Sequence, residues 1–240
     1  MDLHGFSLSA GSKSSAHSGT ATCITTKGKF YLLTAAHVWK ALQGGEFAVS
    51  LEAERVMLSI NREFTEPKII GPGSGDWGPD LALIRIPDLV ARDIQQLKAF
   101  YNLDRHRPEP PAIPGAEQST LWTVLGAPAE RSVVGPDDAV LNLTLFDTWE
   151  VKTNYTNRFD YHDLRFNRHR RPALPRSYGG ISGSGLWQIP LMLNPGRGEI
   201  GWSWAIRLAG VAFYQLDRSD DESLIRCHGE KSLEILLAAV

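Results

Sequence analysis

Residues 32–38 read Leu-Leu-Thr-Ala-Ala-His-Val, an apolar run that ends in small residues and a single histidine, His37. Further along, residues 80–86 read Asp-Leu-Ala-Leu-Ile-Arg-Ile, and residues 179–187 read Gly-Gly-Ile-Ser-Gly-Ser-Gly-Leu-Trp. Each segment alone has an ordinary explanation, because polar strand ends, turn aspartates and Gly/Ser-rich loops are common. Together, and in this order, the three segments favour a catalytic constellation.

The residue types in these segments are those needed to activate a hydroxyl group. An imidazole takes the serine proton during attack and returns it to the leaving group. A carboxylate holds the imidazole in the right tautomer and stabilises its charged form. Backbone N–H groups stabilise the oxyanion, and glycine near the serine lets them point inward. The three segments supply groups of these types in His37, Asp80 and the serines at positions 182 and 184.

These segments resemble the signature blocks of the chymotrypsin-like serine peptidases. Residues 34–38 (TAAHV) match the block around the general base, 79–86 (PDLALIRI) the block around the aspartate, and 180–185 (GISGSG) the nucleophile block. The resemblance implies an oxyanion hole formed by the backbone N–H groups of Gly180 and Ser182. The chain order His, Asp, Ser also agrees with this fold, whereas α/β-hydrolases run Ser, Asp or Glu, His.

Ser184 is the competing nucleophile. It lacks a glycine two residues before it, whereas Ser182 has Gly180 there, so Ser182 is favoured. Two positions depart from the secreted members of the family, because Val38 replaces a cysteine and Ile181 replaces an aspartate. Activation by burial of a newly cut N-terminus is therefore not expected, and the chain looks like a stand-alone protease domain of the bacterial type.

The composition is ordinary for a globular protein: 42% of the 240 residues are hydrophobic, 22% are charged, and the net charge is −2. Such a chain has no global field for nucleic acid or an anionic membrane, so neither is an expected partner. No apolar run is long enough to span a bilayer, and the N-terminus lacks the pattern of a secretory signal. Two distant cysteines fit free thiols in a reducing compartment, which predicts a cytoplasmic location.

Cys227 and His228 are adjacent and could in principle bind a metal. Two further ligands are not found nearby, so a packed C-terminal segment is the favoured interpretation. We expect no metal and no cofactor.

Short runs of β-forming residues, broken by Gly, Pro, Asp and Asn, dominate the chain. Six expected strands fall in the N-terminal part, at residues 6–10, 20–26, 29–34, 46–51, 55–60 and 81–86, with a brief helix at 35–42. The expected strands of the C-terminal part are at residues 121–125, 139–151, 159–166, 185–189, 200–206 and 208–215. This pattern predicts an all-β fold of two packed six-stranded β-barrels, with the site between them and a C-terminal helix.

Four parts are expected along the chain. Residues 1–90 form a barrel carrying His37 and Asp80, and residues 91–118 form a helix and an interdomain linker with four prolines at 107–115. Residues 119–216 form the second barrel, which carries Ser182, and residues 217–240 form a helical segment.

The family resemblance also suggests where a substrate would lie. Ala212, Phe213 and Tyr214, on the strand after the serine, are expected to face the substrate backbone. Arg176, six residues before the serine, would lie at the pocket floor and could favour acidic side chains, unless it is simply solvated. The basic run at 168–171 (RHRR) is more simply a solvated loop than a contact for peptide or nucleic acid.

The predicted function is a serine endopeptidase that cleaves protein or peptide substrates through an acyl-enzyme. Two alternatives are a catalytically silent or partner-gated binding module, and an esterase using the same triad. The presence of all three triad residue types argues against a catalytically silent module. The sequence does not separate a peptidase from an esterase, because peptide and ester substrates share the acyl-enzyme chemistry. A regulatory or effector protein is a further candidate partner, by analogy with the fold alone.

Overall fold

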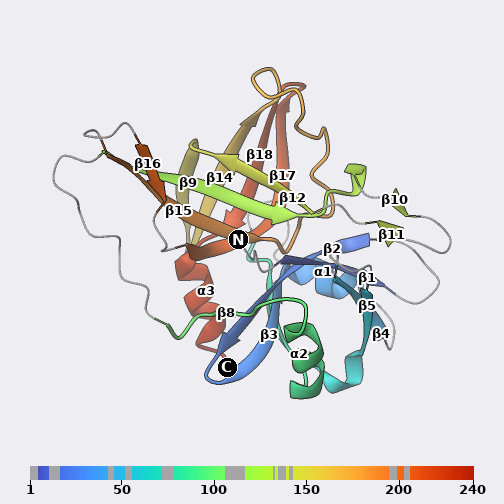
Figure 1. The fold of residues 1–240 in the computed structure, drawn as a ribbon. Coiled ribbons are helices and arrows are strands. Elements are labelled where there is room, and N and C mark those ends of the chain that lie inside the picture. Colours follow the sequence, from blue (N-terminus) through green and yellow to red (C-terminus); the bar gives the residue numbers. More distant parts are fainter. Residues whose placement is uncertain are drawn as a thin grey trace.

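The computed structural model describes residues 5–10, 17–42, 46–51, 56–71, 78–105, 117–131, 133–134, 139–140, 143–194, 199–202 and 206–240. These parts of the chain form two eight-stranded β-sheets, a separate two-stranded hairpin and three short α-helices (Figure 1). None of the described helices is long and apolar enough to cross a membrane.

The first sheet is built from the N-terminal part of the chain. Its strands are β1 (Gly5–Ala10), β2 (His17–Thr26), β3 (Lys29–Thr34), β4 (Glu46–Leu51), β5 (Val56–Asn61), β6 (Glu66–Ile70), β7 (Leu81–Arg85) and β8 (Tyr101–Asn102). They lie in the order β5-β4-β1-β2-β3-β7-β6, and β8 pairs in parallel with β2. Lys27 and Gly28, both at positive φ, form the two-residue turn between β2 and β3, whose twist suits a hairpin.

The second sheet is built from the C-terminal part. Its strands are β9 (Glu117–Gly126), β12 (Thr144–Thr148), β13 (Val151–Thr156), β14 (Phe159–Asn167), β15 (Gly185–Asn194), β16 (Glu199–Trp202), β17 (Arg207–Ser219) and β18 (Glu222–His228). They lie in the order β12-β9-β15-β17-β18-β14-β13, and β16 pairs with β15. The separate hairpin consists of β10 (Val133–Val134) and β11 (Ala139–Val140).

Helices α1 (Ala36–Ala41) and α2 (Asp88–Gln95) belong to the first part of the chain, and α3 (Glu230–Leu237) follows β18. Although α3 follows the second sheet in sequence, its Leu233 shares a buried apolar cluster with Leu81 of β7 in the first sheet. Asp160 of β14 accepts hydrogen bonds from the Ser232 N–H (2.8 Å) and hydroxyl (2.7 Å), which satisfies a donor at the helix N-terminus. Helix α3 therefore connects the two sheets.

The expected all-β class is confirmed, and the strands expected at residues 29–34 and 46–51 have those bounds. Each sheet has eight strands instead of the expected six, because β6 and β8 of the first sheet and β13 and β18 of the second were not among the predicted strands. Within the described ranges each strand order is an open path, so closure into barrels stays a prediction.

The predicted helical segment over residues 217–240 is wrong in its first half. Strand β17 continues to Ser219, β18 follows, and only Glu230–Leu237 is helical. The charge of Arg226 hides the strand pattern of β18, yet in the fold it is buried against Asp163 at 2.7 Å. A paired charge of this kind is compatible with an interior strand.

The segment at 91–118 also differs from its prediction. The apolar residues of the sequence follow a helical period over residues 88–101, yet the helix ends at Gln95, and Tyr101–Asn102 form β8. The Pro-rich stretch at 107–115 lies outside the described residues, and the domain boundaries stay a prediction.

Candidate functional site

His37 and Asp80 meet between two neighbouring strands of the first sheet. His37 lies in the first turn of α1, directly after β3, and Asp80 stands directly before β7, which pairs with β3. The Asp80 carboxylate accepts one hydrogen bond from the His37 backbone N–H at 2.9 Å and contacts His37 Nδ1 at 2.5 Å. A carboxylate can only accept, so Nδ1 carries a proton, and in the neutral ring Nε2 has the lone pair.

The two side chains differ in exposure. The His37 side chain is 44% exposed, whereas that of Asp80 is 12% exposed, so the imidazole is the more solvent-accessible group of the pair. Burial acts to raise the pKa of Asp80, but the hydrogen bonds and charge of His37 outweigh it and hold that pKa below its usual value. Asp80 is therefore ionised at neutral pH and can stabilise an imidazolium.

Ser182 lies in the loop that precedes β15, and this loop is fixed by both sheets. The Ser182 carbonyl accepts a hydrogen bond from the Thr20 N–H of β2 at 2.8 Å. On the other side, the Gly183 N–H donates to the Ala212 carbonyl of β17 at 2.7 Å. The Ser182 hydroxyl donates to the Phe213 carbonyl at 3.3 Å, and among the described residues no hydrogen bond joins it to His37.

The serine loop and the histidine helix approach each other across Gly19. A Cβ on Gly19 would lie 2.5 Å from the Val38 side chain and 2.9 Å from the Ser182 carbonyl oxygen. Only a residue without a side chain fits between them, because real Cβ atoms do not come this close. The structure thus brings Val38, the residue after His37, and the Ser182 carbonyl close to one glycine.

The predicted oxyanion residues lie in a loop with unusual backbone conformation. Gly180 and Gly183 have φ of +93° and +92°, values that favour glycine. The Gly180 carbonyl accepts a hydrogen bond from the Thr20 hydroxyl at 2.8 Å. These contacts fix the loop on either side of Ser182, while the oxyanion-binding role of Gly180 and Ser182 stays a prediction.

Ser184 and Ile181 point into the protein. Ser184 is fully buried, and its hydroxyl has no hydrogen-bond partner in the described part of the chain. Ile181 is buried in an apolar cluster with Leu186. A substrate could not reach Ser184 without rearrangement of this loop, so burial favours Ser182 as the nucleophile.

Of the three residues expected to contact the substrate backbone, Ala212 already uses its backbone groups in hydrogen bonds within the protein. Its N–H donates to the Ser184 carbonyl at 2.8 Å and its carbonyl accepts from Gly183, so its backbone holds the serine loop. Phe213 is buried and Tyr214 is half-buried, and both follow on the same strand. The Phe213 carbonyl likewise accepts the Ser182 hydroxyl, and a substrate-contacting role for the three residues stays a prediction.

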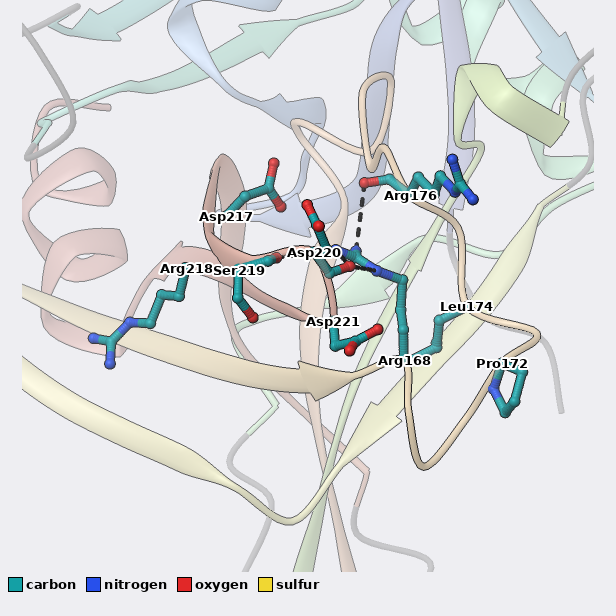
Figure 2. A pocket seen from close by; sticks show the side chains of 9 residues that line it. All are labelled: Arg168, Pro172, Leu174, Arg176, Asp217, Arg218, Ser219, Asp220 and Asp221. Atoms are coloured by element: carbon teal, nitrogen blue, oxygen red, sulfur yellow. Dashed lines mark hydrogen bonds between the residues drawn. The ribbon is translucent and has the colours of Figure 1, made fainter.

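Arg176 lines a surface pocket of about 790 Å³ between the loop after β14 and the β17–β18 turn (Figure 2). Figure 2 shows its guanidinium extending away from Asp217, while its carbonyl points towards Arg168. The full set of lining residues is Arg168, Pro172, Leu174, Arg176, Asp217, Arg218, Ser219, Asp220 and Asp221.

The basic run at residues 168–171 is only partly the solvated loop that was expected. Arg170 and Arg171 are exposed, but Arg168 is half-buried and donates to the Ser223 hydroxyl at 2.7 Å and to the Asp220 carbonyl. Arg168 therefore holds the β14 loop against the β17–β18 turn, and its guanidinium is not available to a ligand.

The expectation of a packed segment at Cys227 and His228 is confirmed, since both are fully buried in β18. Sequence reasoning nevertheless missed that His228 contacts the site. Its Nε2 accepts a hydrogen bond from the Asp80 backbone N–H at 3.0 Å. No local pattern could have shown this contact, because the two residues are 148 positions apart.

No protein family and no curated protein matches this chain. Among solved structures, one from a study of the intrinsically disordered VPg protein of Sesbania mosaic virus is 17% identical, covers 93% of this chain and 85% of that chain, and has a TM-score of 0.44. An inactive serine-to-alanine mutant of Rv3671c from M. tuberculosis H37Rv is 14% identical, covers 99% of this chain and 86% of that chain, and has a TM-score of 0.39. Similarities at this level carry no argument about family or activity.

Proposed function

We propose that this chain is a serine endopeptidase of the chymotrypsin-like type, with its site between the two β-sheets. The observation that carries the proposal is the paired contact of Asp80 with the His37 N–H and Nδ1, which leaves Nε2 as the ring nitrogen that can act as a base. The motif order supports the same assignment, because His37, Asp80 and Ser182 occur in the order this fold uses.

In the proposed mechanism, Ser182 Oγ attacks the scissile carbonyl while His37 Nε2 takes its proton. Asp80 stays ionised and stabilises the imidazolium. The proton then passes to the leaving amine, and water hydrolyses the acyl-enzyme by the same route. The N–H groups of Gly180 and Ser182 are proposed to stabilise the oxyanion.

The Ser182 hydroxyl must turn from the Phe213 carbonyl towards His37 for this chemistry. Hydrogen bonds of free catalytic sites are often loose and tighten only when substrate binds. The same observation favours a second candidate, a partner-gated module whose serine is released from Phe213 by a bound protein. An esterase would use the same catalytic groups, and only assays on ester and peptide substrates distinguish it from a peptidase.

The two cysteines support a reducing compartment, and we propose a cytoplasmic location. Cys23 and Cys227 are both free and fully buried. Burial raises the pKa of both thiols, so they remain protonated and unreactive.

The test is labelling with a fluorophosphonate probe, which reacts with activated serines, together with cleavage of a peptide library and of a simple ester. Wild type is expected to be labelled and to cleave peptides, Ser182→Ala to lose both activities, and the buried Ser184→Ala to keep them. Labelling that persists in Ser182→Ala would refute the nucleophile. A folded wild type that is labelled only after a partner is added would favour the gated module, and ester cleavage without peptide cleavage would favour the esterase.

A further inference from the structure

His228 is the last residue of β18 and lies in the interior of the second sheet, where it pairs with Val211 of β17 and Tyr161 of β14. Its side chain is fully buried. Two of its contacts are with residues of the proposed site, a hydrogen bond with Asp80 and a ring contact with Phe213.

The first contact is the hydrogen bond from the Asp80 backbone N–H to His228 Nε2, at 3.0 Å. The segment before Asp80 lies directly on the imidazole, since a Cβ on Gly78 would lie 3.1 Å from His228 Cε1. Asp80 is therefore held twice. Its carboxylate is held by His37 of its own sheet, and its backbone is held by His228 of the other sheet.

The second contact is a stacked ring pair. The imidazole of His228 lies on the ring of Phe213, with centroids 4.3 Å apart and an angle of 27° between the planes. The carbonyl of Phe213 is the group that accepts the Ser182 hydroxyl. One side chain thus contacts both the residue that orients His37 and the residue that holds Ser182.

The hydrogen bond from Asp80 also determines the tautomer of the His228 ring. Because Nε2 accepts, the proton lies on Nδ1, which is buried without a partner in the described part of the chain. Burial lowers the pKa of His228 to about 4, against the charges of Asp80 and Asp160, so the ring is neutral near pH 7. A buried donor without a partner is unfavourable for stability. An apolar side chain would fill the same position without this cost, so packing alone does not explain a histidine here.

We propose that His228 is a positioning residue, whose imidazole holds the Asp80 backbone and the Phe213 ring and thereby keeps the Asp80 carboxylate in place against His37. This proposal rests on the proposed peptidase function and adds to it a residue from the second sheet. It does not require His228 to contact substrate.

The test compares His228→Leu, which removes the acceptor, with His228→Gln, whose amide oxygen can still accept from Asp80. His162→Gln is the matched control, because His162 is a buried histidine on β14 that contacts Thr153 and Trp122 instead. The measurements are the fluorophosphonate labelling rate, kcat and KM on a cleaved peptide, and the proton resonance of His37 Nδ1–H.

In His228→Leu the labelling rate and kcat are expected to fall roughly 10- to 100-fold, as for a small misplacement of a catalytic group, with KM nearly unchanged. The His37 Nδ1–H resonance is expected to move, because its hydrogen bond to Asp80 is disturbed. His228→Gln should recover most of the labelling rate and of kcat and should bring the His37 Nδ1–H resonance close to its wild-type position. His162→Gln should change none of these measurements. Wild-type kcat and resonance in His228→Leu, or an equal loss in His162→Gln, would overturn the proposal.

A second variant keeps the test decisive if His228→Leu does not fold. Gly78→Ala retains the imidazole but crowds it, and its positive φ of +64° adds strain before Asp80. It is expected to shift the His37 resonance and slow labelling, and an unchanged resonance in folded Gly78→Ala contradicts the proposal. If wild type is neither labelled nor able to cleave peptides, the proposed function fails, while the resonance still decides the role of His228.

Discussion

The backbone N–H of Thr20 donates a hydrogen bond to the carbonyl of Ser182, at 2.8 Å, and so joins β2 of the first sheet to the serine loop of the second part of the chain. The Thr20 hydroxyl donates to the Gly180 carbonyl in the same loop, also at 2.8 Å. The Thr20 carbonyl in turn accepts from the Thr34 hydroxyl at 2.7 Å. The loop that carries the proposed nucleophile is therefore built on the sheet that carries the proposed base.

Gly183→Ala should damage this junction. A Cβ at position 183 would lie 1.9 Å from the Thr20 carbonyl oxygen and 2.2 Å from the Thr34 hydroxyl, at a φ of +92°. We expect a loss of about 3 kcal/mol or more in the free energy of unfolding, from backbone strain plus steric overlap, and loss of probe labelling. The control is Gly28→Ala, which has a φ of +69° but open space around it, and should lose only about 1 kcal/mol. Equal losses measured by urea unfolding would show that the close approach does not matter.

Thr20→Val tests the hydroxyl contact without removing the backbone hydrogen bond. The Gly180 carbonyl loses the Thr20 donor and the Ala127 N–H loses a long contact to the Thr20 hydroxyl (3.4 Å), which should cost about 1–2 kcal/mol of stability. It should also slow labelling of Ser182, since Gly180 is a proposed oxyanion donor. Thr22→Val on the same strand is the matched control, because the Thr22 hydroxyl is buried without a partner in the described residues and its loss should be neutral or stabilising. If both variants are labelled at the wild-type rate, the Thr20 hydroxyl has no part in shaping the site.

The residues of the proposed triad could be selected from sequence because each lies in a short motif whose chemistry is local. The contacts that hold them could not, because they join distant positions. Neither Thr20 nor His228 carries a local signal, yet one contacts Ser182 and the other contacts Asp80. Strand β18 was not predicted for the same reason, since the pairing of Arg226 with the distant Asp163 becomes visible only in the fold.

Acid should destabilise the protein through His228. Its pKa falls from 6.5 to about 4 on folding, so between these values the unfolded chain binds a proton that the native state does not. Stability should therefore decrease as the pH falls through this window, by up to roughly 3 kcal/mol. The lowered pKa of Asp80 acts in a separate range, because its contribution is present above its usual pKa of 3.8 and lost only below it.

Urea unfolding of wild type and His228→Gln at a series of pH values would measure this contribution. The variant should lose most of the slope and keep a smaller part from His162, whose pKa is also lowered by burial. The same pH dependence in both proteins would mean that His228 does not remain neutral in the native state.

We expect a preference for acidic side chains before the cleaved bond, because the positively charged Arg176 occupies the position expected for the pocket floor. Its side chain is exposed and makes no ion pair in the described part of the chain, while Glu130 accepts from its backbone N–H at 2.9 Å and fixes its position. A hydrogen bond to a charged group contributes about 1.5–3 kcal/mol, so Arg176→Gln should lower kcat/KM on such substrates roughly 10- to 100-fold. Arg218→Gln is the control, since Arg218 lines the same pocket but its guanidinium points away from Arg176 in Figure 2. Profiling on a peptide library decides the matter: cleavage only after Leu or Arg would leave Arg176 a solvated residue with no part in substrate selection.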